Sequence, residues 1–339
     1  MGALISVIIS VLLMLTGCES TPKQAQSGEL SVHFIDVGQG DCTLVMMPDG
    51  KNMLIDAGNK ENSDDITDYL SANGVKKIDY VVATHPHADH IGSMADIISQ
   101  FDIGKIYLPD APHTSKIYDD MLNTISQKGI EAIQAKSGVC VQSGDGITID
   151  LLAPVCDDYS ELNNYSAVVK LTYGKTSFLF MGDAQKLSEN EILSLGENVR
   201  ADVLKCGHHG GATSSGEAFL RAAGPKYAVI SCGKGNSYGH PHAEVLTALK
   251  QGGAAVLRTD LLGSIVITSD GDKVTVQNKY EPQNANAPPK DTDADYVYIT
   301  NSGKKYHREN CARLAKSKIK ITRQDAQSRG LAPCKVCEP

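Results

Sequence analysis

The feature that most constrains this chain is the run Thr84 to His90, which reads THPHADH and carries three histidines and one aspartate. The run follows an apolar segment, Ile78 to Ala83, that is typical of a buried strand. It precedes Ile91 to Gln100, whose apolar spacing predicts a helix. Histidine is the commonest metal ligand in proteins, and aspartate adds a hard anionic oxygen. So many ligand-type side chains at a strand end predict a metal site.

This run contains enough ligands for two ions. Alternate residues in a strand-end loop face the same way. We therefore expect His85 and His87 to bind one ion, while Asp89 and His90 turn toward a second. A polar turn with solvated histidines is the alternative, but four ligand-type side chains within six residues argue against it.

The rest of the chain alternates short apolar runs with helical patterns. The expected strands are 31–37, 42–47, 52–56, 78–83, 105–108, 147–152, 167–173, 177–181, 202–206, 227–231, 255–258, 264–268 and 273–277, and the expected helices are 64–72, 91–100 and 115–127. Many strands interleaved with helices predict an α/β sandwich.

The N-terminus predicts a targeting signal. Ala3 to Leu15 is apolar and uncharged, and it is too short to span a bilayer comfortably. It ends in LTGC, which resembles a bacterial lipobox whose cysteine, here Cys18, is lipid-modified. We expect a signal peptide at 1–17, a tether at 18–28 and an extracytoplasmic lipoprotein held to the membrane by a lipid anchor only. An ordinary secretory signal with a chance cysteine is the alternative.

Further motifs follow in a fixed order along residues 29–279. They are His33 to Asp41 (HFIDVGQGD), Leu54 to Gly58 (LIDAG), Asn163 to Ser166 (NNYS), Phe180 to Asp183 (FMGD), Gly207 to Gly211 (GHHGG), Tyr238 to His242 (YGHPH) and Arg258 to Asp260 (RTD). Together with H-x-H-x-D-H, this series resembles the metallo-β-lactamase superfamily and, within it, the branch of the ComEC-type competence proteins. The resemblance implies an αββα sandwich with metals at one edge of its sheets.

The resemblance also implies the ligands of two divalent ions, Zn²⁺ or Mn²⁺. His85 and His87 correspond to ligands of the first ion, and Asp89 and His90 to ligands of the second. Asp183 corresponds to the carboxylate that bridges both ions.

At the remaining positions of the family pattern, this chain either offers two candidates or lacks the usual residue. His208 is expected to complete the second ion, with His209 as the alternative, and Asp56 to orient a ligand histidine. Most family members supply a third histidine to the first ion before the bridging aspartate. This chain has Asn164 or Ser166 near that place, as the ComEC-type branch does, so the first ion is expected to be held less completely.

Paired cations predict hydrolytic chemistry. Two divalent ions about 3.5–4 Å apart share a water, lower its pKa toward about 7 and clamp a phosphoryl group from both sides. Asp89 is a catalytic candidate because it can orient that water as well as bind. His240 is a second candidate, for contact with the substrate oxyanion or protonation of the leaving oxygen, although it could instead cap a helix that starts near Pro241.

The C-terminal segment predicts a separate small module. A Pro-, Asn- and Asp-rich linker is expected at 280–295, followed by a zinc-binding module at 296–339. Its ligands would be His307, Cys311, Cys334 and Cys337, a spacing that suits one structural Zn²⁺. The segment resembles the metal-binding module of the Ada DNA-repair protein, but His307 stands where Ada has its methyl-accepting cysteine, so methyl transfer is not implied. A disulfide within the segment is the alternative.

The net charge of the C-terminal module is opposite in sign to that of the remainder of the chain. From Tyr296 onward ten Lys and Arg face three Asp and Glu, a net charge of +7, which leaves −15 on the remainder of a chain whose total is −8. A basic module favours contact with nucleic acid, although a charge run can be a solvated face. We expect a phosphodiesterase or nuclease acting on extracellular DNA. The alternatives are a hydrolase of another ester (phosphorylcholine, a lactone or a β-lactam) and a non-catalytic DNA-binding surface lipoprotein.

Overall fold

The computed structural model describes residues 28–277, 296–300, 304–308, 311–314, 318–322, 326 and 331–337. The chain divides into two compact units, residues 1–288 and 289–339. We call the described part of the first unit, residues 28–277, the body, and the second unit the C-terminal unit. The predicted signal peptide, Cys18, the tether up to residue 27 and the linker at 280–295 lie outside the described residues. Among the described residues, no helix has the length and apolar character needed to cross a bilayer.

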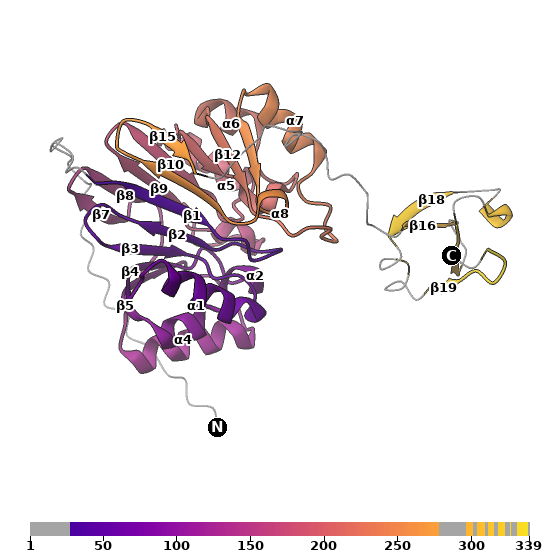
Figure 1. The fold of residues 1–339 in the computed structure, drawn as a ribbon, viewed down its shortest axis with the longest axis horizontal. Coiled ribbons are helices and arrows are strands. Elements are labelled where there is room, and N and C mark those ends of the chain that lie inside the picture. The colour runs from indigo at the N-terminus through magenta and orange to yellow at the C-terminus, as the bar shows by residue number, and fades with distance from the viewer. Residues whose placement is uncertain are drawn as a thin grey trace. The chain divides into compact units, whose positions relative to one another are not determined.

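Two mixed β-sheets form the centre of the body (Figure 1). In spatial order the first contains β15 (Val274–Val276), β14 (Ile265–Ser269), β1 (Leu30–Phe34), β2 (Thr43–Met46), β3 (Asn52–Ile55), β4 (Lys77–Val82), β5 (Asp102–Leu108) and β6 (Glu131–Gln134). The second contains β13 (Ala255–Arg258), β12 (Tyr227–Ile230), β11 (Val203–Lys205), β10 (Thr176–Phe180), β9 (Val168–Tyr173), β8 (Ile147–Ala153) and β7 (Cys140–Gly144). Strands β3 to β6 are parallel, and so are β10 to β13.

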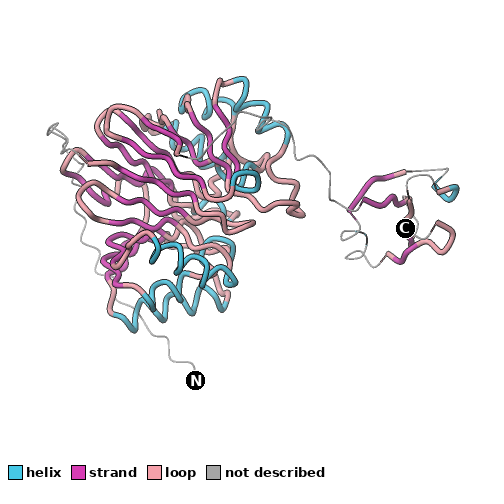
Figure 2. The backbone as a smooth tube through the Cα atoms, in the orientation of Figure 1, coloured by secondary structure: helices cyan, strands magenta, loops and turns pink. Residues whose placement is uncertain are grey.

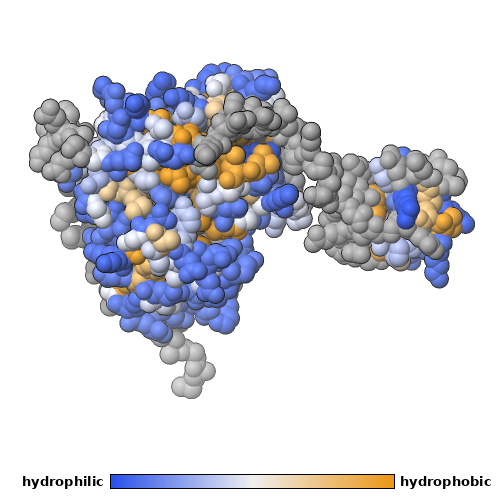
Figure 3. Space-filling view, viewed as in Figure 1, coloured by the Kyte–Doolittle hydropathy of each residue, from blue (hydrophilic) through white to orange (hydrophobic). Residues whose placement is uncertain are grey.

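Helices cover the outer face of each sheet, as Figure 2 shows. The first sheet carries α1 (Ser63–Ala72), α2 (Ala88–Ile91), α3 (Met94–Gln100) and α4 (Lys116–Lys128). The second carries α5 (Lys186–Ser194), α6 (Glu217–Ala223) and α7 (Ala243–Gln251), and α8 (Thr259–Leu262) follows β13. Short 3₁₀ turns lie at Lys60–Asn62 (η1), Leu162–Tyr165 (η2) and Gly207–Gly210 (η3). In Figure 3 the surface over α1 and α4 is mostly hydrophilic, as expected for helices with one buried face.

Side-chain alternation along the strands builds three apolar layers. Phe178 and Phe180 point from β10 toward the first sheet, where the ring of Phe34 lies 6.0 Å from that of Phe180. The residue between them, Leu179, packs on the opposite face with the helices of the second sheet. A third layer joins α1, α3 and α4 to the first sheet. The predicted αββα sandwich is therefore confirmed, because period-two alternation gives both sheets two apolar faces.

Two departures from the predicted elements have local causes. The expected helix over 91–100 is broken, since Gly92 packs against the backbone of Lys60, where a Cβ atom would lie 2.4 Å from its nitrogen. Helices α5 and α6 were not among the predicted elements. Each has fewer than ten residues, and its N-cap residue, Gln185 in α5 and Gly216 in α6, forms no side-chain capping hydrogen bond.

The C-terminal unit is built from two small sheets. Strand β16 (Tyr296–Ile299) pairs antiparallel with β18 (Ile319–Thr322), and β17 (Lys305–Tyr306) pairs parallel with β19 (Ala332–Pro333). A 3₁₀ turn, η4 (Ala312–Leu314), follows Cys311. His307 directly follows β17 and Cys334 directly follows β19, so the parallel pairing brings these two side chains to the same end of the small sheet.

The first prediction concerns the cap of α4. The hydroxyl of Ser115 accepts a hydrogen bond from the Tyr118 amide at 3.2 Å, and Gly129 ends the helix in the left-handed conformation. Replacing Ser115 with alanine should lower the free energy of unfolding by about 1 kcal/mol, measured by urea denaturation. Ser126→Ala, an exposed position in the last turn of α4, is the matched control and should be neutral or slightly stabilising. Equal effects of the two substitutions would contradict the capping role.

Candidate metal centre

The candidate site lies at one edge of the sandwich, where parallel strands of both sheets end. Asp56 follows β3, and Thr84 to His90 follow β4 in the first sheet. Asp183 follows β10, and the pair His208–His209 follows β11 in the second sheet. Because parallel strands present their carboxyl ends at one edge, the stacked sheets bring these four segments together.

The ligand-type side chains form two groups that share one carboxylate. The first group is His85, His87 and Asp183, and the second group is Asp89, His90, Asp183 and His209. In each group, one potential ligand atom from every member lies within 4.8 Å of the others. The two halves of the H-x-H-x-D-H run therefore separate, with its first two histidines in one group and its aspartate and last histidine in the other.

Asp183 lies between the two groups. Its Oδ1 is 3.3 Å from Nε2 of His90 and 3.7 Å from Nε2 of His209. Its Oδ2 is 3.8 Å from Nε2 of His85 and also 3.8 Å from Nε2 of His208. One carboxylate oxygen faces each group, which is the arrangement that a bridging ligand of two cations requires.

A hydrogen bond on the far nitrogen fixes the orientation of both histidines of the second group. His90 donates from Nδ1 to Oδ2 of Asp56 at 2.8 Å, and His209 donates from Nδ1 to the carbonyl oxygen of Ser231 at 3.0 Å. Since carboxylate and carbonyl oxygens only accept, these bonds leave each Nε2 lone pair pointing into the cluster. Asp56, predicted to orient a ligand histidine, thus contacts His90.

His85 is oriented by two hydroxyl groups. The hydroxyl of Thr84 donates to Asp56 at 2.7 Å, so its oxygen can accept from Nδ1 of His85 at 3.1 Å. Ser166 lies 3.3 Å from the same nitrogen and also accepts a hydrogen bond from the Asp183 amide at 3.0 Å. Ser166, at the place of the missing third histidine, therefore supports both His85 and Asp183 from behind.

Two buried atoms of the cluster fit a bound cation. Within the part of the chain that the structure describes, Nε2 of His90 and Oδ1 of Asp183 are buried and form no hydrogen bond. Buried polar atoms are normally paired, so a ligand is expected at this point. Imidazole nitrogens and carboxylate oxygens at this separation suit zinc, manganese or iron in their divalent states.

The electrostatics of the cluster favour positive charge at the same place. Burial disfavours a charged His209, but the carboxylates of Asp183 and Asp41 outweigh burial and raise its pKa to about 10. Against the same burial penalty, Asp183 and Asp56 raise the pKa of His90 well above its usual value. A histidine that binds a metal must be neutral, so a divalent cation would replace these protons and supply the positive charge that the carboxylates favour.

The comparisons with known proteins agree with this geometry. The family model described as "Metallo-beta-lactamase superfamily" matches residues 35–234, more than half of the chain. The chain belongs to the metallo-beta-lactamase superfamily. Members of this superfamily are usually metal-dependent hydrolases that hold divalent cations, and that coarse function applies to this chain.

Two curated relatives are named for competence. ComE operon protein 3 of Bacillus subtilis (strain 168) is 33% identical over 256 residues, which cover 70% of this chain and 33% of that protein. Competence protein ComA of Neisseria gonorrhoeae is 29% identical over 258 residues, covering 76% of this chain and 35% of that protein. This chain therefore spans about a third of the length of either relative.

Among solved structures, the metallo-beta-lactamase fold protein YhfI from Bacillus subtilis matches 71% of this chain and 100% of its own, with a TM-score of 0.49 and 14% identity.

For the histidine pair, the structure favours the alternative assignment, His209, over His208, which the resemblance placed first. His209, not His208, lies with the second group, at 3.1 Å from Oδ2 of Asp89. His208 instead directs Nδ1 to the hydroxyl of Thr213 at 2.8 Å and approaches Asp183 on the side of His85. Both histidines have left-handed backbone angles, with φ of 50° and 53°, so their rings diverge. Two adjacent histidines in a sequence do not predict such a left-handed turn.

His240 lies beside His208, with 5.3 Å between the ring centres. Gly211 makes this approach possible, since a Cβ atom there would lie 2.9 Å from Nε2 of His240. Burial and the imidazoles of His209 and His208 lower the pKa of His240 to about 4. His242 directly precedes α7 and accepts a hydrogen bond from the Ala212 amide at 2.9 Å, so it stabilises the loop that contains Ala212.

An ion pair that the sequence did not predict supports the second group. Lys205, at the end of β11, donates from Nζ to Oδ2 of Asp41 at 2.7 Å and to the carbonyl oxygen of Cys206 at 3.1 Å. The other Asp41 oxygen lies 3.3 Å from Nδ1 of His209. Burial would raise the pKa of Asp41, but Lys205 and His209 lower it to about 2. The pair therefore holds a negative charge behind a candidate ligand histidine.

The C-terminal unit gathers all four of its predicted ligands. His307, Cys311, Cys334 and Cys337 each offer an atom within 4.8 Å of the others, and Nδ1 of His307 is 3.3 Å from Sγ of Cys311. The three cysteines are free thiols, not disulfides. Backbone amides of Arg308 and Val336 point at the sulfur atoms of Cys337 and Cys334, at 3.3 and 3.4 Å. Amide donors around thiolates and an imidazole in fourfold arrangement fit a structural Zn²⁺.

The second prediction tests the Lys205–Asp41 pair in metal-free protein. Replacing Lys205 with methionine leaves a buried carboxylate without its cation and should lower the free energy of unfolding by about 3–5 kcal/mol, measured by urea denaturation. The control is Lys116→Met, which removes an exposed pair with Asp120 and should change stability by less than about 0.5 kcal/mol. A loss below about 1 kcal/mol for Lys205→Met would show that the pair is dispensable.

The third prediction concerns the C-terminal ligands. Cys337→Ser should remove one equivalent of zinc per chain, because a structural site needs all four ligands. Zinc can be counted by elemental analysis of the purified chain. The matched control is Cys156→Ser, which changes an exposed free thiol of the body and should leave zinc content unchanged. Equal zinc in wild type and Cys337→Ser would rule out the assignment.

Proposed function

We propose that this protein is a binuclear metal-dependent phosphodiesterase that acts as a nuclease on extracellular DNA. The observation that carries the proposal is the position of Asp183, with one carboxylate oxygen toward each of two ligand groups. When bound, two divalent cations would supply Lewis acidity to a phosphoryl group and a water activated as nucleophile. The metal identity, Zn²⁺ or Mn²⁺, is part of the proposal, because imidazole and carboxylate ligands suit both.

The candidate ligands of the chain divide into two sets, one for each metal ion. His85, His87 and Asp183 would hold the first ion, and Asp89, His90, Asp183 and His209 the second. His208 approaches the Asp183 oxygen on the first side, so we assign it to the first ion in the place of the missing third imidazole.

The open side of the cluster indicates where a substrate would enter. His87, Asp89 and His208 are half-buried, whereas His85, His90 and His209 are buried. A phosphodiester would therefore approach over the half-buried side chains. Asp89 would orient the attacking water, and His240, beside His208, would contact a non-bridging phosphate oxygen.

DNA is the substrate that we place first for two reasons. The relatives named above are competence proteins, and competence concerns the uptake of DNA. The segment from Tyr296 onward also carries a net charge of +7, which favours contact with a phosphate backbone. Anchoring through Cys18, proposed from the sequence, would place both parts outside the cytoplasm, where extracellular DNA is available.

The fourth prediction is that Asp183→Asn lowers metal-dependent hydrolysis of DNA and of bis(p-nitrophenyl) phosphate by about 100-fold or more. The amide cannot supply two anionic oxygens to two cations, so elemental analysis should also show loss of metal from the body but not from the C-terminal unit. Asp64→Asn, an exposed carboxylate at the start of α1, is the control and should keep full activity.

Each other outcome selects a different interpretation. Hydrolysis of lactone or β-lactam substrates without any phosphodiester cleavage would replace the substrate class while keeping the metal centre. DNA binding that survives metal removal, with no turnover on any substrate, would contradict the enzymatic proposal and leave a DNA-binding lipoprotein.

A further inference from the structure

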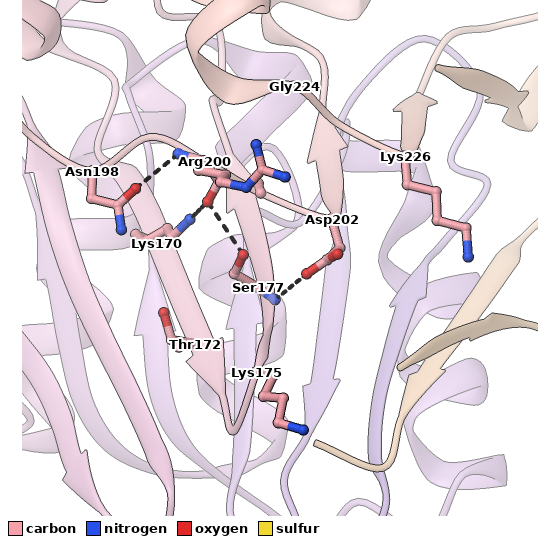
Figure 4. A pocket seen from close by; sticks show the side chains of 10 residues that line it. Lys170, Thr172, Lys175, Ser177, Asn198, Arg200, Asp202, Gly224 and Lys226 are labelled. Carbon is pink, nitrogen blue, oxygen red and sulfur yellow. Dashed lines mark hydrogen bonds between the residues drawn. The ribbon is translucent and has the colours of Figure 1, made fainter. Parts of the chain in front are cut away.

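A polar cavity separate from the metal centre lies at the other end of the strands of the second sheet. It has a volume of about 440 Å³ and is lined mainly by Lys170, Ser177, Asn198, Arg200, Asp202 and Lys226 (Figure 4). These residues come from the hairpin of β9 and β10 and from the segments that lead into β11 and β12, where those strands begin. The metal-binding groups lie beyond the other end of the same strands, so the two sites share no residue.

The cavity is strongly basic in an acidic part of the chain. The cavity is lined by the basic side chains of Lys170, Lys175, Arg200 and Lys226 and by the acidic side chain of Asp202, a formal local charge of +3, whereas residues 1–295 together carry −15. Asp202 is engaged by the Ser177 amide at 2.9 Å. Lys175 forms an ion pair at 2.6 Å with Asp272, a residue that does not line the cavity, and this pair offsets the charge of Lys175. Lys170 and Arg200 therefore dominate the charge of the cavity.

Lys170 is a buried cation that forms no direct ion pair among the described residues, although the nearby Asp202 carboxylate favours its charge. It is 7% exposed, and among the described residues its ammonium donates only to the carbonyl oxygen of Arg200, which also accepts from the Ser177 hydroxyl. Asp150 neighbours it on β8, but no ion pair joins the two. Lysine is almost never this buried without a paired anion, and an ammonium has three N–H donors. Two donors are left for a ligand.

Arg200 supplies a second cationic group on the accessible side of the cavity. It is exposed, and within the described ranges its guanidinium forms no ion pair. The Asn198 side chain accepts from the Arg200 amide at 3.2 Å, which fixes the backbone of this segment. A buried ammonium beside an exposed fork of N–H donors suits the tetrahedral oxygens of a phosphate group.

We propose that this cavity is a phosphate-binding site that takes the phosphate group of a small phosphorylated molecule, independently of the metal centre. Its volume falls within the range of small-molecule sites and admits a nucleoside monophosphate. The hydroxyl of Thr172 adds a polar group at the wall. Burial lowers the pKa of Lys170 to about 8, so the side chain is still mainly charged at neutral pH, and a bound anion would offset the cost of burying it.

The test is calorimetric titration of the full-length chain with inorganic phosphate and with adenosine 5′-monophosphate, in EDTA so that no cation at the metal centre captures the anion. We expect saturable binding of one equivalent. Arg200→Gln should weaken it at least tenfold, since a charge-assisted hydrogen bond is lost. Lys170→Met should weaken it as much. Because Lys170 is buried, urea denaturation checks that this variant folds, and the exposed Arg200→Gln decides the matter if it does not.

Matched controls locate the binding. Arg221→Gln changes an exposed arginine of α6 outside the cavity, and Lys116→Met an exposed lysine of α4; both should bind as wild type does. Equal affinity for both probes would assign the site to the phosphate group alone, and tighter binding of the nucleotide would mean that the rest of the molecule is contacted too. No binding by wild type, or binding that Arg200→Gln leaves unchanged, would overturn the proposal.

Discussion

The edge of this sandwich depends on one electrostatic requirement, that carboxylates buried between two sheets be neutralised. Asp183 and Asp56 are almost fully buried, and Asp41 lies close behind them. Lys205 neutralises Asp41, while His90 and His209 lie against the other carboxylates. The imidazoles cannot serve both as proton carriers and as metal ligands, so bound cations would take over the positive charge. Stability of this edge and metal binding are therefore two aspects of the same charge balance.

The fold contributes rigidity and direction to this balance. The candidate ligands follow parallel strands whose carboxyl ends meet at one edge of the sandwich, namely β3 and β4 in the first sheet and β10 to β12 in the second. Short loops after these strands are therefore enough to bring the ligand side chains together. Hydrogen bonds that the histidine rings form with oxygens of Asp56, Ser166 and Ser231 then orient the rings. A site supported in this way needs little reorganisation when cations bind, which is the condition for electrostatic catalysis.

The opposite edge of the second sheet has the reverse polarity. Lys170 and Arg200 make that edge locally positive, whereas the metal centre gathers carboxylates. Strand β11 connects the two, with Asp202 before it and Lys205 at its end. The C-terminal unit, with its own four-ligand cluster, is basic as a whole. Positive and negative charge are thus segregated along the chain and within the body.

The sequence by itself determined the layers of the sandwich and the division of the H-x-H-x-D-H run, because side-chain alternation and ligand spacing are local properties. The resemblance of its motifs to the metallo-β-lactamase superfamily also implied that Asp56 and Asp183 belong to the site. Only the tertiary structure decided that His209 and not His208 joins Asp89, that Lys205 reaches Asp41, and that Lys170 and Arg200 line one cavity. Those contacts join residues up to 164 positions apart or depend on a left-handed turn at two histidines, and both follow from strand register and backbone packing, which no local pattern records.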